Sequence, residues 1–251
     1  MKTYNWQTAF ADTGAIGFVW LAAWLLLYRL PADHPNITTQ ELALIQDGSQ
    51  PVRKLSDPKV PWLSLFGHRQ TWGLMLGRFF SDPDWWLYLF WLPKYLADKR
   101  GFTMDQIGML AWLPYITADL GAVFGGLLSR FLIKRNWEVL PFALVMPISL
   151  LIIWTPSSAV VLLVICVVTF SHMAWKTNIM TITNDIYPTH GVGSVAGIVA
   201  FGNGLGGTLF TFLVGYIVQN YGYDSIFFMM GFMHPLAFVL FRWLVRKPVL
   251  V

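Results

Sequence analysis

The sequence is poor in charged residues and in cysteine. Only 12% of its 251 residues are Asp, Glu, Lys or Arg, whereas a soluble domain carries roughly 25%. The single cysteine, Cys166, excludes an internal disulfide, and no cysteine–histidine group has metal-ligand spacing. The sequence also has no nucleophile elbow, no His-Glu-x-x-His pair and no phosphate-binding loop. We therefore expect no enzyme, no catalytic residues, no metal and no cofactor.

Apolar residues, by contrast, are abundant. They make up 56% of the chain, aromatic residues make up 16%, and the mean hydropathy is +0.55. A globule of this length cannot bury so much apolar surface, so lipid must solvate the remainder. The net charge of +4 comes from basic residues at the ends of apolar runs, which excludes a nucleic-acid-binding face. The composition predicts an all-α, polytopic membrane protein.

Seven apolar runs approach the ~20 residues that cross a bilayer core of ~30 Å. They lie at Phe10–Tyr28, Trp72–Leu96, Ile107–Leu132, Val139–Thr155, Ala159–Tyr187, Ser194–Val218 and Ile226–Leu244. Backbone groups in lipid must bond within their own segment, and the long alternating pattern of a barrel is missing. The runs therefore predict a bundle of seven transmembrane helices.

A proline-containing loop divides these spans unequally. We expect a first transmembrane helix in residues 1–28, a cytoplasmic linker in 29–71 and a six-helix bundle in 72–251. Within the linker, Asn36–Gln46 predicts a short interfacial helix, with Thr38 as its cap and Glu41 at capping-box distance.

Lysine and arginine predict the orientation, because they accumulate in cytoplasmic loops. Eleven of the seventeen fall on one side: Arg29, Arg53, Lys54, Lys59, Arg69, Arg130, Lys134, Arg135, Arg242, Arg246 and Lys247. The other side receives Lys2, Lys99 and Arg100. We expect the N-terminus outside and the C-terminus in the cytoplasm.

Four stretches resemble one family of carriers. They are Ser81–Leu96 with its Asp-Pro-x-Trp-Trp run, Leu113–Tyr115 with Ala118–Gly121 and Gly125–Gly126, His172–Asn178 with Asp185–Pro188, and Trp6–Phe10 with Gly14, Gly17 and Trp20. Together they resemble helices six to twelve of the anion:cation symporter family, the hexuronate and aldonate carriers of the major facilitator superfamily.

The resemblance implies a twelve-helix carrier of a bacterial inner membrane, of which this sequence supplies the C-terminal half. Helices one to five would hold the groups that couple transport to H⁺ or Na⁺ and that grip the substrate carboxylate. It also implies that the sequence's own polar and aromatic side chains form one wall of the translocation path.

Candidate substrate contacts are polar and aromatic side chains within the spans. Trp112, Tyr115 and Asp119 follow the i, i+3, i+7 spacing of one helix face. This face suits a sugar ring and its hydroxyls, although a carboxylate bonded to a neighbouring helix explains Asp119 equally well. Tyr88 and Trp91 belong to a second aromatic face, for which core packing is the alternative.

The fifth span carries a polar seam. Ser171, Trp175, Asn178 and Asp185 recur at i, i+4, i+7 and i+14. A seam of this length is costly against lipid, so it should face the translocation path or a partner helix. In the sixth span Asn203 is a further candidate contact for a hydroxyl or carboxylate, with helix–helix hydrogen bonding as the alternative.

Four ionisable residues are candidates for ion pairing or gating. Arg78 and Asp82 lie four residues apart and can pair, next to Pro83, which interrupts the helix. His172 is either a proton carrier or a satisfied hydrogen-bonding residue. Lys176 either extends toward the cytoplasm or neutralises a carboxylate.

Two functions fit these features. The first is a secondary active symporter of small organic anions, most of all sugar acids such as hexuronate or galactonate. The second is a truncated or half-size membrane subunit that transports nothing by itself. The partners expected are the organic anion, the lipid bilayer, and a five-helix N-terminal half or a second copy of the chain.

Overall fold

The computed structural model describes residues 5–47, 61–133 and 140–245. All regular structure in these three stretches is helical. The chain forms two units, Met1–Asp57 and Pro58–Val251. The prediction of an all-α membrane fold is confirmed. Several basic residues used to predict the orientation lie outside the described stretches: Lys2, Arg53, Lys54, Lys59, Lys134, Arg135, Arg246 and Lys247.

The first unit contains one long apolar helix and two short ones. Helix α1, Trp6–Leu27, begins where the Asn5 side chain accepts a hydrogen bond from the Thr8 amide at 2.9 Å. None of its residues is buried. The 3₁₀ turn η1, Pro31–Asp33, leads to α2, Thr39–Asp47.

The capping box predicted for the linker helix is present. The Thr38 amide donates to the Glu41 carboxylate at 3.0 Å, and the Glu41 amide donates to the Thr38 hydroxyl at 3.2 Å. These bonds, the backbone one foremost, hold the pKa of Glu41 below its ordinary value. The prediction of a short helix here is confirmed.

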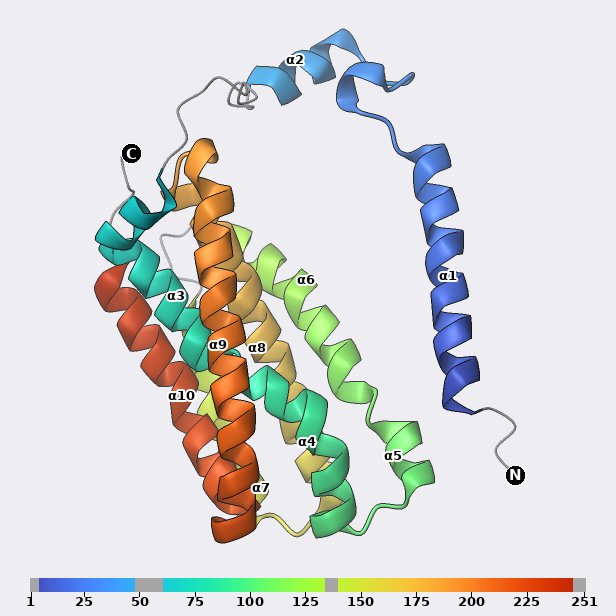
Figure 1. Ribbon diagram of the computed structural model, residues 1–251, viewed down its shortest axis with the longest axis vertical. Helices are drawn as coiled ribbons and strands as arrows, with labels where there is room; N and C mark the ends of the chain where they lie inside the picture. Colours follow the sequence, from blue (N-terminus) through green and yellow to red (C-terminus); the bar gives the residue numbers. More distant parts are fainter. Residues whose placement is uncertain (1–4, 48–60, 134–139, 246–251) are drawn as a thin grey trace. The chain divides into compact units, whose positions relative to one another are not determined.

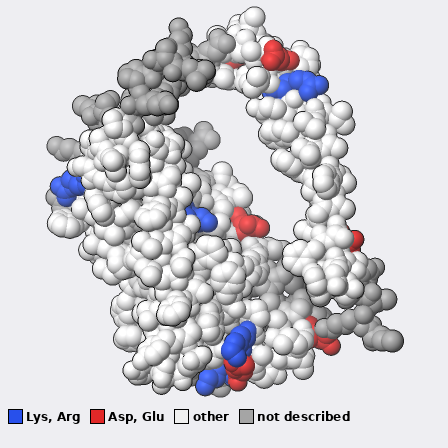
Figure 2. Space-filling view, viewed as in Figure 1, with Lys and Arg blue, Asp and Glu red and all other residues white. Residues whose placement is uncertain are grey.

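The second unit is a helical bundle (Figure 1). Its elements are η2 Trp62–Gly67, α3 Arg69–Ser81, α4 Pro83–Arg100, α5 Met104–Leu110, α6 Leu113–Ile133, η3 Leu140–Leu150, α7 Leu151–Trp154, α8 Ser158–Ile186, α9 Thr189–Tyr221 and α10 Tyr223–Leu244. Helix α8 packs on α6 and η3, while α3 packs on α9 and α10. The visible face is mostly uncharged (Figure 2), as lipid requires.

Five helical segments of the described residues are long and apolar enough to cross a membrane: Trp6–Leu27, Met104–Ser129, Ser158–Ile186, Gly191–Tyr221 and Tyr223–Leu244. The expected span Trp72–Leu96 is divided into α3 and α4, because Pro83 stands at the first position of α4 and donates no backbone hydrogen bond. The span expected at Val139–Thr155 corresponds to η3, a 3₁₀ segment containing Pro147, followed by α7, and Val139 lies outside the described residues. The count of seven spans stays a prediction.

Two apolar clusters fill the bundle at different heights. One contains Leu87, Val168 and Met230, and the other contains Leu74, Trp175 and Ala237. On α8 and α10 alike, the residues between the two clusters include a fully buried histidine, His172 and His234. A buried polar layer therefore lies between two apolar ones.

Helices α6 and α8 approach closely because α6 presents glycine. A Cβ on Gly121 would overlap the Phe170 carbonyl, and one on Gly125 would lie 2.6 Å from the Ala174 Cα. Gly126, the next residue, has open space beside it. Substituting Gly125 and Gly126 in turn therefore distinguishes the loss of a close helix contact from the change in helix propensity, which both substitutions share.

We expect Gly125→Ala to destabilise the bundle by about 1–3 kcal/mol, the cost of overpacking a tight contact. Gly126→Ala should change stability by no more than about 1 kcal/mol, the propensity difference between the two residues. Unfolding by SDS, followed by circular dichroism, measures both. Equal midpoints for the two variants would contradict the close contact of α6 with α8.

Candidate functional site

The polar layer begins at the junction of α3 and α4. Arg78, in the last turn of α3, places its Nε 2.5 Å from the Asp82 carboxylate, and both side chains are at most 5% exposed. Asp82 is the single residue between the two helices. Burial makes each charge dependent on the other, since neither reaches water.

Two histidines continue the layer. His172 Nδ1 on α8 lies 3.0 Å from His234 Nε2 on α10. His234 Nδ1 in turn lies 2.6 Å from the Asp84 carboxylate, at ion-pair distance but without the alignment of a hydrogen bond. At the other end, His172 Nε2 lies 4.0 Å from Asp82. Four side chains from three segments of the bundle thus form a continuous row.

Aromatic rings border this row. The Trp85 ring stacks on His172, with centroids 5.9 Å apart and planes 10° apart. Tyr115 of α6 meets Trp85 edge-on at 5.8 Å. Both aromatic residues are half-buried, as is Lys176, the cation one turn beyond His172. Trp85 and Tyr115 thus connect the row to α6 through ring contacts.

Several buried polar atoms in and beside the layer have no hydrogen-bond partner within the described protein: Arg78 Nη1, Asp84 Oδ1, Tyr88 Oη, Ser149 Oγ, His172 Nε2, Trp175 Nε1 and His234 Nδ1. Buried polar groups are rarely left in this state, and a concentration of them marks a functional site or a strained one. The layer also contains the aspartates, the arginine and the histidines that are buried among the described residues: Arg78, Asp82, Asp84, His172 and His234.

Three of the sequence-based candidates are not brought together. Asp119 is exposed on α6, whereas Trp175 is fully buried and meets Phe238 and Phe241 edge-on. Asn203 accepts a hydrogen bond from the Trp86 indole at 3.3 Å. Within the described bundle they do not line one common passage.

The remaining candidates pack inside the bundle. Asn178 donates to the carbonyls of Ala174 and Gly125, a bond that joins α8 to α6. Tyr88 is buried in the first apolar cluster, with Trp91 packed against it. The polar seam of α8 therefore faces partner helices over most of its length, and only its last member, Asp185, is exposed.

Sequence reasoning missed His234 and treated Asp84 only as part of a motif. Both are nearly inaccessible, at 0% and 2%. The signal that identifies them is an ionisable residue within an apolar helix. Which helix each one faces depends on the packing, which helical spacing alone does not specify.

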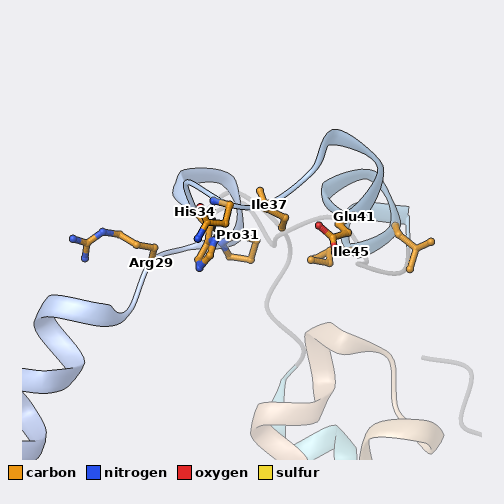
Figure 3. A pocket seen from close by; sticks show the side chains of 8 residues that line it. Arg29, Pro31, His34, Ile37, Glu41 and Ile45 are labelled. Atoms are coloured by element: carbon orange, nitrogen blue, oxygen red, sulfur yellow. Dashed lines mark hydrogen bonds between the residues drawn. The ribbon is translucent and has the colours of Figure 1, made fainter.

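Two open hollows among the described residues lie away from this row. One of them is in the first unit (Figure 3), where Arg29, His34 and Glu41 accompany apolar side chains. A second, of about 760 Å³, lies beside Trp86 and Gly207 and is predominantly apolar. Neither contains the row of buried ionisable groups.

Comparison with known proteins places the chain in a family. The profile of the Major Facilitator Superfamily matches residues 1–211 and 177–250. The hexuronate transporter of Escherichia coli K12 is 30% identical, with 98% of this chain and 59% of that protein covered. The galacturonate transporter of Dickeya chrysanthemi is 35% identical over 50% of this chain and 37% of that protein. The D-galactonate transporter of E. coli O6:H1 is 27% identical over 87% of this chain and 54% of that protein.

The family-model match covers more than half of the chain and therefore shows its family. The chain belongs to the Major Facilitator Superfamily. It spans little more than half the length of the hexuronate and D-galactonate transporters. The resemblance carried by the Asp-Pro-x-Trp-Trp run is thereby confirmed.

We expect Arg78→Met to destabilise the bundle by about 3–5 kcal/mol, because it leaves Asp82 buried without its partner. The double variant Arg78→Met/Asp82→Leu should recover most of that loss, since neither member of the pair then remains without the other. SDS unfolding of both variants and of the unaltered chain tests this. A double variant as unstable as the single one would show that the pair is not the source of the loss.

Proposed function

We propose that the chain is the C-terminal part of a secondary active symporter for small organic anions, with sugar acids such as hexuronate and galactonate as substrates. The observation that carries the proposal is the hexuronate transporter match across 98% of the chain. Transporters of galacturonate and D-galactonate, also similar to this chain, extend the substrate class to sugar acids in general.

Among the candidate contacts, those that reach an accessible surface are the best placed to touch substrate. Tyr115 and Asp119 on α6 and Asn203 on α9 are half-buried or exposed. The Tyr115 ring and the Asp119 carboxylate, one turn apart on α6, match the apolar face and the hydroxyls of a sugar, and the Asn203 amide is a separate contact on α9. Lys176, half-buried on α8, supplies a cation for the substrate carboxylate. The remaining candidates pack behind these contacts and would hold them in place: Tyr88, Trp91, Trp175 and Asn178.

One observation favours the alternative of a half-size subunit that does not transport alone. Large apolar side chains on α6 and α9 are exposed, among them Val123, Leu127, Phe201 and Phe212. Faces of this kind are suited to lipid, to a five-helix N-terminal half or to a second copy. The carrier and the subunit differ in whether this chain alone moves substrate.

Reconstitution distinguishes the two. We expect radiolabelled galacturonate to enter proteoliposomes that hold this chain together with the five-helix N-terminal part of a related hexuronate transporter. Liposomes with the N-terminal part alone are the control. Uptake by this chain alone would exclude the subunit alternative, and no uptake in either preparation would refute the carrier.

We place the chain in the bacterial inner membrane with its N-terminus outside and its C-terminus in the cytoplasm. The distribution of lysine and arginine supports this orientation. In this orientation, η2 would lie on the cytoplasmic side of the membrane, and the N-terminal end of α5 would lie on its outer side.

Cysteine labelling tests the orientation. In a Cys166→Ala background, Ser64→Cys and Met104→Cys each introduce one exposed thiol at opposite ends of the bundle. A membrane-impermeant maleimide added to intact cells should label Met104→Cys and leave Ser64→Cys unlabelled until the membrane is opened. The reverse pattern would invert the proposed topology.

A further inference from the structure

The row of Asp84, His234, His172 and Asp82 has three gaps, of which the one between His172 and Asp82 is too long for a direct hydrogen bond. The gaps are Asp84 to His234 at 2.6 Å, His234 to His172 at 3.0 Å, and His172 to Asp82 at 4.0 Å. Every atom that faces a gap is a carboxylate oxygen or a ring nitrogen. Two such atoms attract each other only when a hydrogen lies between them.

Neutral imidazoles supply one ring hydrogen each, so the two histidines fill two of the three gaps. If His234 donates to Asp84, His172 must donate to His234, and His172 Nε2 then faces the Asp82 carboxylate without a hydrogen. In the opposite tautomers, the empty gap is the one between His234 and Asp84. Either arrangement accommodates one more proton.

The charges around the row favour that proton. The two carboxylates bring two negative charges, and Arg78 compensates one of them directly. Lys176 of α8 is half-buried and acts on Asp82 from the edge of the layer. Both cations thus act on Asp82, whereas the groups that act on Asp84 are His234 and Asp82 itself. One added proton therefore compensates Asp84 in an interior where an uncompensated charge is costly.

Beyond Arg78 and Lys176, the described residues bring no further lysine, arginine or carboxylate to act on the row, and Asp119 of α6 is exposed. Helix α9 and segment η3 contain no Asp, Glu, Lys or Arg in their sequences, and η3 contributes the neutral Ser149 hydroxyl. Helix α4 adds Tyr88, whose hydroxyl is buried, and α6 adds Tyr115 on the far side of Trp85. The row is therefore the group of this layer that is able to take up a proton.

We propose that Asp84, His234, His172 and Asp82 form a binding site for one proton in the middle of this bundle. The proton comes from water and is shared along the row, so that the two rings and two carboxylates pass from two negative charges to one. If the chain is part of the proposed carrier, this site makes H⁺ the ion to which transport is coupled. That assignment of the coupling ion rests on the proposed carrier function. It also places coupling groups in this chain, whereas the family resemblance placed them in helices one to five.

The test is a titration of the full chain, ¹⁵N-labelled at histidine, in lipid nanodiscs from about pH 5 to pH 9, the range in which histidine is a proton carrier. His172 and His234 should change together in a single step, with uptake of one proton by the row. Two independent transitions, or none in this range, would overturn the proposal. A step that shifts when sodium replaces choline would assign the site to a metal cation and overturn it as well.

Variants assign the step to its residues. Asp84→Asn should lower the proton affinity of the row at least about tenfold, one unit on the pH axis, because a carboxylate beside His234 is removed. His234→Gln should abolish the joint transition. His68→Gln, a histidine outside the layer, is the matched control and should leave it intact.

Because the titration is read without substrate, it separates this inference from the carrier proposal. Joint titration without sugar-acid uptake would retain the proton site and refute the carrier. Uptake without joint titration would retain the carrier and refute the proton site.

Discussion

The burial of ionisable side chains between packed helices is the constraint on which the polar layer depends. Pro83 ends α3 and starts α4 within a stretch that would otherwise be one helix. The residues at the break, Asp82 and Asp84, bring two carboxylates into the interior, where only other helices can supply partners. Arg78, His172 and His234 provide them from α3, α8 and α10.

The same contacts fix how the helices lie against one another. A buried ion pair contributes little net stability, and its best-attested role is to specify register. Here the row of ionisable groups lies at one height, with an apolar cluster on either side. A shift of α8 or α10 along its axis would move a histidine into one of these clusters. The glycine contacts of α6 with α8 add a second restraint of a steric kind.

Much of the fold was predictable from local patterns. Apolar runs predicted a helical membrane protein, Thr38 and Glu41 predicted a capped helix, and the spacing of Arg78 and Asp82 allowed the pair now seen. The interruption at Pro83 was predicted, since proline cannot donate a backbone hydrogen bond. The 3₁₀ segment η3 was not predicted, because hydropathy measures apolar length and not hydrogen-bond pattern. Helical spacing placed Tyr115 and Asp119 on one face of a helix, but it did not specify whether that face lies against other helices or on the surface of the bundle. His234 is recognisable in the sequence as an ionisable residue within an apolar helix, but the sequence does not identify its partner. Only the packing of α8 against α10 brings it to His172.

The account depends most directly on the contact between these two rings in the bilayer. Solid-state ¹⁵N spectroscopy of the full chain in lipid detects scalar coupling across an N–H···N bond. We predict such a coupling between His172 Nδ1 and His234 Nε2, the atoms that lie 3.0 Å apart. Two rings that correlate with water and not with each other would contradict the account, because the row would then be interrupted between α8 and α10.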